Sequence, residues 1–488
     1  MATINSAFHI MSQALEADQS ALSIVANNVA NANTTGYTRE VPNWQENSPV
    51  EINGVSYGAG VTETGATSIR DRVLEQRLAQ QQQLASASGA RLTALNSLQA
   101  LFPPDSGSSS ATAGDIGFDI TSFFDSFSSL EANPTDNALR QQVLSTASTL
   151  SGDISNAAAG LSSQRSALDQ EASGVTSQVN ALTGSIAQLN TQIQAMSPNS
   201  DPGTLEDQRQ QDLSQLSQLI GINQVTTENN GLSITTTSGQ LLVSEGSSFQ
   251  LTTGLVGGVT HFYVGATDVT GGLTSGGGEL GGYLTARDND IPTALSALDQ
   301  MAYSISAAVN AQNNAGTDQN NVEGTGTNQS GVTGTGITPL YIFNEPAASP
   351  PATVAGCAAS MKVVMVDPSN IAAAALGNQT GDNSNAGAMY NLANQSIVNG
   401  QTPTNYFSTF VSQLGSTVAE VETENAAQSA SVTQLQTQQD SLSGVNLNEE
   451  ASAMQQFETC YQAASQVFNI LNTIMTSALN LGVETAVS

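Results

Sequence analysis

The sequence predicts a mainly α-helical protein with β-rich insertions, in which both ends of the chain form one coiled-coil layer. Apolar residues repeat at heptad spacing at both ends, the spacing continues through long segments between them, and two other segments are rich in Gly and Thr. We expect a terminal layer of residues 1–36 and 445–488, a long helical bundle of residues 37–314 and 401–444, and a small β-rich domain of residues 315–400 inserted outward.

An apolar seam runs along the N-terminal segment. Successive seam residues lie three or four positions apart, except for one seven-residue step in which Asp18 occupies the skipped position. This spacing predicts an amphipathic helix that packs along a single stripe. The seam consists of Ile4, Phe8, Met11, Leu15, Leu22, Val25 and Val29.

A second seam with the same period lies at the C-terminus. Its members are Leu447, Met454, Phe457, Tyr461, Phe468, Leu471 and Met475, with Ala464 and Ala478 between and after them. A further apolar row, formed by Val467, Ile470, Ile474 and Leu481, widens the stripe, so this helix needs more than one partner. The N-terminal helix is one. The others are either a bundle core within one monomer or neighbouring copies of the chain, and periodicity alone leaves both open.

The middle of the chain alternates between helical and strand-like segments. Heptad spacing predicts helices over 71–102, 160–197, 204–220, 286–314 and 404–443. Alternating residues with Gly-rich turns predict antiparallel strands over 222–285. The short apolar runs at 337–343 and 361–366 favour strands in the β-rich insertion.

Composition excludes several classes of function. The chain has 488 residues, with 10 Lys+Arg against 41 Asp+Glu, so its net charge is -31. A chain this poor in cations is a poor ligand for nucleic acid, because phosphate binding needs clustered cations. Charged residues make up only 10% of the chain, which fits either an acidic or saline habitat or a surface that packs against copies of itself. Composition does not separate these two explanations.

No catalytic, cofactor or metal site is expected from the sequence. The chain has two histidines and two cysteines, which are too few and too far apart for a metal cluster or a disulfide framework. The stretch "RDND", with Asp288 and Asp290, lacks the glycine and glutamate of a calcium loop, so we expect it to cap a helix that begins at Ile291. We also expect neither a secretory signal nor a membrane-inserted segment, because no long apolar run occurs.

The stretch "ANNVANANTTGYTRE" at residues 26–40 marks the exit from the first helix. Asparagine side chains bond orphaned backbone groups at a helix end, and glycine provides a positive φ. We therefore expect a fixed turn here. Its residues are Asn27, Asn28, Asn31, Asn33, Gly36 and Tyr37.

This stretch resembles the N-terminal motif of the bacterial flagellar rod and hook axial proteins. Residues 443–481, "SGVNLNEEASAMQQFETCYQAASQVFNILNTIMTSALNL", resemble the matching C-terminal motif, and segments 205–222 and 277–316 agree as well. The form of the C-terminal motif is that of the subunits at the hook–filament junction. Thr35 stands where the family often has proline, and residues 315–400 match poorly.

The resemblance implies a structural subunit of the extracellular flagellum, not an enzyme. Its implied partners are a ring of identical subunits, the hook protein, a second junction protein adjoining the filament, and a chaperone of type III export. In the family the terminal helices order on assembly, and the turn after the first helix packs against adjacent subunits. The alternatives are a hook or rod subunit of the same family, and a secreted coiled-coil adhesin or translocator, which would not explain both terminal motifs.

Overall fold

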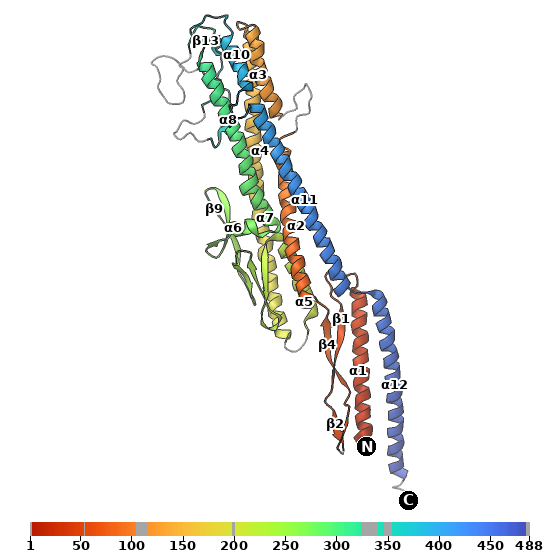
Figure 1. Cartoon of the computed structure of the whole chain (residues 1–488). Coiled ribbons are helices and arrows are strands. Elements are labelled where there is room, and N and C mark those ends of the chain that lie inside the picture. Colours follow the sequence, from red (N-terminus) through yellow and green to blue (C-terminus); the bar gives the residue numbers. More distant parts are fainter. Residues whose placement is uncertain are drawn as a thin grey trace. The chain divides into compact units, whose positions relative to one another are not determined.

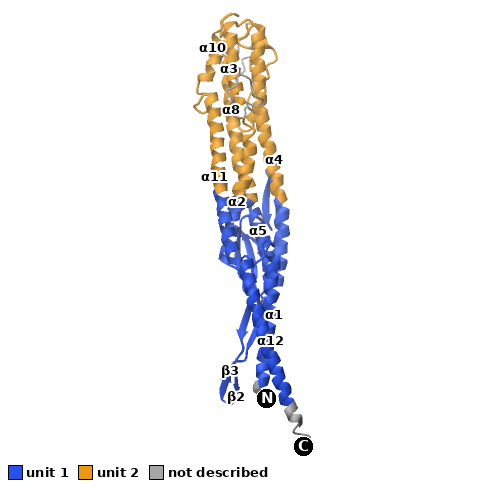
Figure 2. Cartoon of the chain, turned by 90° about the vertical axis from the view of Figure 1, so that its right-hand side faces the viewer, with its two compact units in different colours: residues 1–86, 175–278, 427–488 blue, residues 87–174, 279–426 orange. Residues whose placement is uncertain are grey.

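The structure is a computed structural model that describes residues 2–52, 54–103, 115–197, 201–323, 340–345 and 354–484. The chain divides into two compact units, each built from separate stretches of sequence (Figure 2). Unit 1 contains residues 1–86, 175–278 and 427–488, and unit 2 contains residues 87–174 and 279–426. The expected class, mainly helical with small separate sheets, is confirmed.

The long helices of unit 1 include both ends of the chain. Helices α1 (Ala2–Asn31) and α12 (Leu447–Glu484) lie side by side (Figure 1). The unit also contains α5 (Gly203–Leu219) and α6 (Thr270–Gly276). Four described helices contribute residues to both units: α2 (Arg72–Gln99), α4 (Asn137–Met196), α11 (Pro403–Ser443) and, through Gly278 alone, α7 (Gly278–Thr285).

The described strands of unit 1 form four small antiparallel sheets. In the N-terminal hairpin, β1 (Glu40–Glu46) pairs with β4 (Val61–Ser68), and β2 (Val50–Ile52) pairs with β3 (Val55–Tyr57). A four-stranded sheet has the order β5 (Ile222–Thr226), β6 (Leu232–Thr236), β7 (Leu241–Ser244), β8 (Ser247–Ser248). A three-stranded sheet has β10 (Val259–Val264) between β9 (Leu251–Val256) and β11 (Thr267–Asp268), and the short helix η1 (Glu228–Asn230) joins β5 to β6.

Strands predicted over 222–285 are confirmed only as far as Asp268. The glycine-rich residues that follow form α6 and then α7 (Gly278–Thr285), so the prediction was wrong for 270–285. The physical reason is that glycine lets α7 pack closely against α2. A Cβ on Gly282 of α7 would lie 2.3 Å from the carbonyl oxygen of Ala87 and 2.8 Å from the Cβ of Ala90, so glycine here permits two helices to touch.

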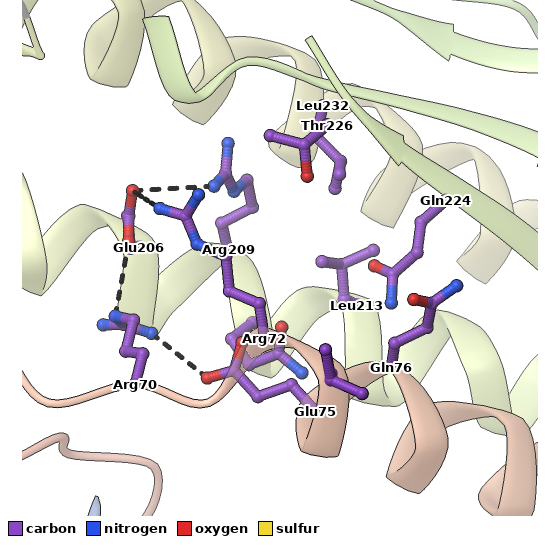
Figure 3. A pocket seen from close by; sticks show the side chains of 12 residues that line it. Arg70, Arg72, Glu75, Gln76, Glu206, Arg209, Leu213, Gln224, Thr226 and Leu232 are labelled. Carbon is purple, nitrogen blue, oxygen red and sulfur yellow. Dashed lines mark hydrogen bonds and ion pairs between the residues drawn. The ribbon is translucent and has the colours of Figure 1, made fainter.

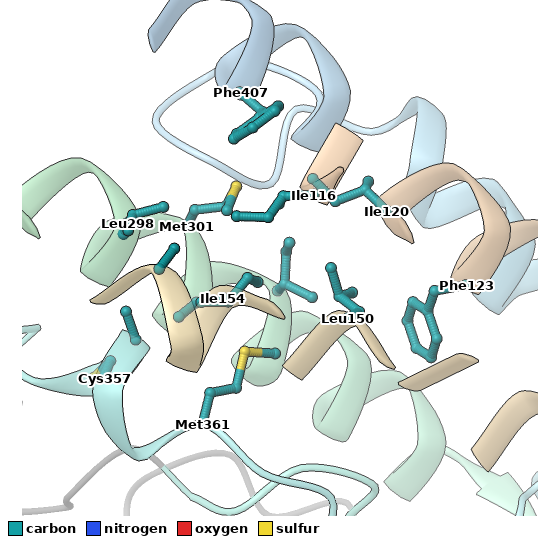
Figure 4. Close-up of a cluster of buried hydrophobic side chains, with 14 of the residues drawn as sticks. Ile116, Ile120, Phe123, Leu150, Ile154, Leu298, Met301, Cys357, Met361 and Phe407 are labelled. Carbon is teal, nitrogen blue, oxygen red and sulfur yellow. The ribbon is translucent and has the colours of Figure 1, made fainter. Parts of the chain in front are cut away.

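Unit 2 is a helical unit around one apolar core (Figure 4). Its further helices are α3 (Ile116–Ala132), the π-helical turn η2 (Ala286–Asp290), α8 (Ile291–Asn314), α9 (Cys357–Ser360), η3 (Pro368–Asn370), α10 (Ser384–Asn391) and η4 (Leu392–Asn394). Helix α3, which we did not predict, begins where the Asp115 carboxylate accepts a hydrogen bond from the backbone N–H of Phe118 at 3.0 Å. It places Phe123, Phe124 and Phe127 fully inside the core.

The expectation that 315–400 is β-rich is corrected for its described residues. They contain one two-residue strand pair, β12 (Gly316–Thr317) with β13 (Ala374–Ala375), together with short helices and loops. Their apolar side chains belong to the core of unit 2, with Ile342 and Phe343 fully buried. The described residues of 315–400 therefore contribute to the core of unit 2, and whether the segment can be replaced stays a prediction. The run at 337–339 lies outside the described residues.

Buried asparagines of α8 hold this segment in place. The Asn310 carboxamide oxygen accepts from the backbone N–H groups of Ile342 and Phe343, both at 3.0 Å, and its nitrogen donates to the Phe343 carbonyl oxygen at 2.9 Å. Asn313 likewise donates to the Leu340 carbonyl at 2.6 Å and accepts from the Ala372 N–H at 3.0 Å. These side chains take the place of a β-ladder as partners for the backbone of residues 340–343 and Ala372.

The "RDND" stretch does not cap a helix. Asp290 has helical angles (φ -71°, ψ -48°), because η2 continues directly into α8. Its carboxylate instead accepts two hydrogen bonds from the Arg91 guanidinium, both at 2.9 Å. Asp288 accepts from Arg287, which is 1% exposed. Both carboxylates are thus used in ion pairs within unit 2.

Unit 2 also contains a buried acid that makes stability depend on pH. Burial, a hydrogen bond with Asp153 and the charges of Asp153 and Asp115 raise the pKa of Asp119 on α3 from 3.8 to about 7. Because the folded state keeps this proton at pH values where the unfolded chain releases it, the free energy of unfolding should fall as pH rises from about 4 to about 7. Urea unfolding at several pH values in this window should give a smaller pH dependence for Asp119→Asn. The exposed Asp125→Asn on the same helix is the control, and an equal slope in all three proteins would contradict the assignment.

Candidate functional site

The two ends of the chain meet in an antiparallel helix pair. The rings of Phe8 on α1 and Phe468 on α12 lie 4.3 Å apart between centroids at an interplanar angle of 39°. Near the other end of the pair, Asn28 lies against Glu450. Both aromatic residues belong to the predicted seams, so the contact follows the heptad spacing.

The helix pair buries its seams only in part. Val25 is buried, whereas Val29, Leu447 and Tyr461 are exposed. The half-buried members are Ile4, Phe8, Met11, Leu15, Leu22, Met454, Phe457, Phe468, Leu471 and Met475. One partner helix thus covers part of each stripe and leaves the rest available to another surface. The role of these residues in assembly stays a prediction.

The second apolar row of α12 lies on the solvent side. The exposed fractions are 42% for Val467, 59% for Ile470 and 45% for Ile474, and Leu479, which was not predicted in this row, is 61% exposed. The side chain of Leu481, also predicted in this row, lies outside the described residues. Soluble monomeric proteins seldom expose a row of large apolar side chains along one helix.

The N-terminal hairpin packs beside the helix pair. Trp44 of β1 meets Phe457 edge to face, with ring centroids 5.8 Å apart and planes at 87°. The Asn47 side chain donates to Gln13 at 3.1 Å, and Ser20 donates to Glu63. Helix α1, helix α12 and the hairpin therefore form one structure.

The turn after α1 is fixed by its own side chains. Asn31 donates to the Asn27 carbonyl oxygen at 3.1 Å and to the Asn27 side chain at 2.9 Å, and the Thr34 N–H donates to the Asn31 carbonyl at 2.8 Å. Gly36 has φ +81°, the positive value predicted for it. Asn33 is exposed, and no hydrogen bond of its side chain is found among the described residues.

Asn28 joins the turn to both ends of the chain. It is 1% exposed, and its nitrogen donates to the Glu40 carbonyl oxygen at 2.8 Å and to the Glu450 carboxylate at 3.0 Å. Its oxygen accepts from the Tyr37 hydroxyl at 2.9 Å and from the Glu40 N–H at 3.0 Å. All four hydrogen-bonding positions of this amide are therefore used.

An ion pair fastens the start of α12 to the same place. Arg39 donates through Nε to Glu450 at 2.7 Å and through a terminal nitrogen to Glu449 at 2.9 Å. Its backbone N–H donates to the Ser443 carbonyl at 2.9 Å. Glu450 is 1% exposed, so Arg39 and Asn28 together compensate a buried charge.

Burial and crowded carboxylates shift two pKa values at this site. Burial raises the pKa of Tyr37 well above its usual value, and the charges of Glu40, Asp207 and Glu450 add to the shift. Burial also raises the pKa of Glu40, again with contributions from nearby aspartates. Tyr37 therefore keeps its proton and stays a hydrogen-bond donor to Asn28.

The sequence predicted the turn after α1 but not the residues that contact it. We did not predict that Arg39 pairs with Glu449 and Glu450, or that Thr38 bonds Asp207. A signal for the first pair was present, because Arg39 is one of only 10 cations and acidic residues open the final helix. Thr38 and Asp207 are 169 positions apart, and no spacing rule connects them.

In the described part of the chain, no group of three or more His, Cys, Asp or Glu is placed to hold a metal ion. His261 bonds Asp268 at 2.7 Å on an exposed hairpin, and hydrogen bonds from Thr270 and His261 lower the pKa of Asp268 to about 2. None of the described helices combines the length and apolar character needed to cross a membrane.

Family models match two parts of the chain. The helical domain of the flagellar hook-associated protein FlgK matches residues 107–328, and the flagella basal body rod protein family matches residues 10–38. The second match covers most of α1 and the asparagine turn. The structure is similar to the flagellar hook junction protein FlgK from Burkholderia pseudomallei, with a TM-score of 0.62 and 19% identity, over 75% of this chain and 100% of that one.

Similarity to curated proteins extends over almost the whole chain. The flagellar hook-associated protein 1 of Escherichia coli K12 is 26% identical, covering 96% of this chain and 98% of the relative. The proteins of the same name from Salmonella typhimurium LT2 and Bacillus subtilis 168 are also 26% identical, with 97% and 96% of this chain covered and 99% and 96% of the relatives. The terminal motifs, the helical-domain match and the fold agree with one another, and the chain is similar to flagellar hook-associated protein 1 over nearly its whole length.

Proposed function

We propose that this chain is a structural subunit of the bacterial flagellum that joins the hook to the filament and self-assembles through its N- and C-terminal helices. The carrying observation is the terminal helix pair. Its seams are half-buried, and α12 exposes Ile470, Ile474 and Leu479 to solvent. Such a surface is suited to burial against neighbouring subunits.

The implied partners follow from this position in the flagellum. Identical subunits would form a ring, the hook protein would lie on one side, and a second junction protein adjoining the filament would lie on the other. The subunit would leave the cell through type III export with a chaperone and act outside it. The basis for these assignments is the family resemblance and the names of the relatives.

A strain lacking the gene tests the function. We expect hooks of normal length without filaments, and flagellin monomers in the medium, because filament growth has no junction to start from. Restoring the gene should restore filaments, and a tagged protein should label hook tips. Absence of hooks would favour a hook or rod subunit instead, and normal filaments would favour a secreted adhesin or translocator.

The isolated subunit should have protease-labile ends. A single antiparallel pair with half-buried seams is marginally stable, because most helical stability in proteins comes from tertiary packing. Limited proteolysis of the monomer should remove residues 1 to about 35 and the chain from about 445 onward, and leave the rest intact. The same digestion of assembled junctions should spare both ends. Full protection of both ends in a verified monomer would contradict ordering on assembly.

A further inference from the structure

The terminal arm, defined as α1, the β1–β4 hairpin and α12, contacts the rest of unit 1 largely through polar groups. Between residues 37 and 70, with 52 and 53 left aside, Thr38 is the one buried residue, and no apolar side chain of this stretch belongs to a core. The hairpin packs on the arm's own helices, as the Trp44–Phe457 contact shows. Apolar burial therefore contributes little to holding the hairpin on the helices beyond the arm.

Carboxylates at the N-terminal end of α5 hold both ends of the hairpin. At the start of the hairpin, Asp207 accepts from the Thr38 N–H at 3.1 Å and from the Thr38 hydroxyl at 2.6 Å. At its end, Asp201 accepts from the Ser68 N–H at 2.9 Å. Two carboxylates next to one helix N-terminus thus hold the backbone where the hairpin begins and where it ends.

Arg70 completes this attachment from the chain that leaves the hairpin. Its guanidinium donates to the Gly203 carbonyl oxygen at 2.9 Å and to Asp207, and its Nε lies 3.3 Å from Glu206. Figure 3 shows Glu206 between Arg70 and the two arginines Arg72 and Arg209, with contacts of 3.4 Å and 3.9 Å to the latter pair. The side chains of Arg70 and Glu206 are 7% and 5% exposed, so these charges depend on one another.

Cavities surround this polar cluster. Arg70 borders three of them, of about 140, 360 and 370 Å³, all within unit 1. Their lining is largely polar, with glutamines such as Gln210 and Gln436 and carboxylates such as Asp440. A joint made of ionic contacts and bordered by open space can separate without exposing an apolar core.

We propose that the N-terminal end of α5, with Asp201 just before it, is an ionic clamp that holds the terminal arm on the rest of unit 1 and can open while the rest of unit 1 stays folded. The clamp consists of Asp201, Glu206 and Asp207 on one side and Thr38, Ser68 and Arg70 on the other. When it is closed it fixes the direction of the arm. When it is open, the arm turns about the chain links at residues 70–72 and 443–447. This inference does not depend on the proposed function.

Pulsed electron paramagnetic resonance tests the clamp on the full chain. Spin labels are placed at Gln45→Cys on the hairpin and Gln208→Cys on α5, both exposed, in a Cys460→Ser background in which Cys357 remains buried. We expect a narrow distance distribution with the clamp intact and a distribution at least twice as broad with Asp207→Ala. Hydrogen exchange at the Thr38 and Ser68 amides should rise at least tenfold, with unchanged exchange in the core of unit 2.

Asp212→Ala is the matched control. Asp212 lies on the same helix and accepts from the Ser185 hydroxyl at 2.6 Å, the same kind of bond at the same length, but it does not contact the arm. If Asp207→Ala loses helical circular dichroism, Thr38→Val decides instead, because it removes only the hydroxyl bond and should broaden the distribution to a smaller extent. A broad distribution before any clamp mutation, or one that Asp207→Ala and Thr38→Val leave narrow, would overturn the proposal.

Discussion

Cells that carry Phe468→Asp should build hooks, secrete flagellin and lack filaments. Phe468 contacts Phe8 between the two terminal helices, and a carboxylate there costs several kcal/mol unless it is protonated. The pair would then not present a continuous seam to neighbouring subunits. Electron microscopy of hook tips and immunoblots of the medium would measure the effect.

Two further variants test whether the loss of filaments is specific to the seam. Phe468→Leu keeps the position apolar and should retain most filaments, and Asn469→Asp adds the same charge at the neighbouring exposed position and should be silent. The purified Phe468→Asp protein should keep the helical content of unit 2, whose core does not include this residue. Normal filaments in the Phe468→Asp strain would remove this contact from the proposed mechanism.

The Asn28→Asp substitution should loosen the terminal arm more than any other change of similar size at the turn. It replaces an amide that donates to the Glu450 carboxylate at 3.0 Å with a second carboxylate, which is repelled by Glu450 and by the Glu40 carbonyl oxygen. A hydrogen bond to a charged group contributes about 1.5–3 kcal/mol, and the repulsion adds to its loss. Hydrogen exchange across α1 and the first turns of α12 should rise about a hundredfold, as a loss of roughly 2.7 kcal/mol implies.

The neighbouring Asn27→Asp is the matched control, because Asn27 is exposed and does not contact Glu450. A carboxyl beside another carboxylate has a raised pKa, so acidification should protonate Asn28→Asp, return a donor toward Glu450 and restore part of the protection. The stability lost at neutral pH is thus regained as the pH falls. Equal exchange in Asn28→Asp and Asn27→Asp at neutral pH would show that the buried amide does not hold the arm.

The sequence predicts the helix pair well because its signal is periodic. Seam residues at heptad spacing place Phe8 and Phe468 on facing stripes, and Gly36 lies where a helix exit needs a positive φ. These are local rules, and each can be read within one segment of the chain. The same rules could not say which face of α12 stays exposed, since that depends on what packs beside it.

Contacts between distant segments explain what the sequence did not predict. The composition of 315–400 predicts strands, but the backbone of its described residues is held by Asn310 and Asn313 of α8. Asp290 has the residue type of a helix cap, but its helix begins earlier and Arg91 takes its carboxylate. In each case a side chain serves a partner far along the chain, which local propensity cannot identify. The division of the assembled protein into layers at residues 36, 314, 400 and 444 stays a prediction.

Amide side chains and charged side chains fasten different parts of this molecule, and dissolved salt affects them differently. The carboxamides of Asn310 and Asn313 hold backbone groups without carrying a net charge. The pair between Arg39 and Glu449 is partly open to solvent, where at 1 M salt charges are screened over about 3 Å. Rising salinity therefore weakens the contact between the start of the hairpin and α12 within the terminal arm, and leaves the docking of the loops on α8 nearly unchanged.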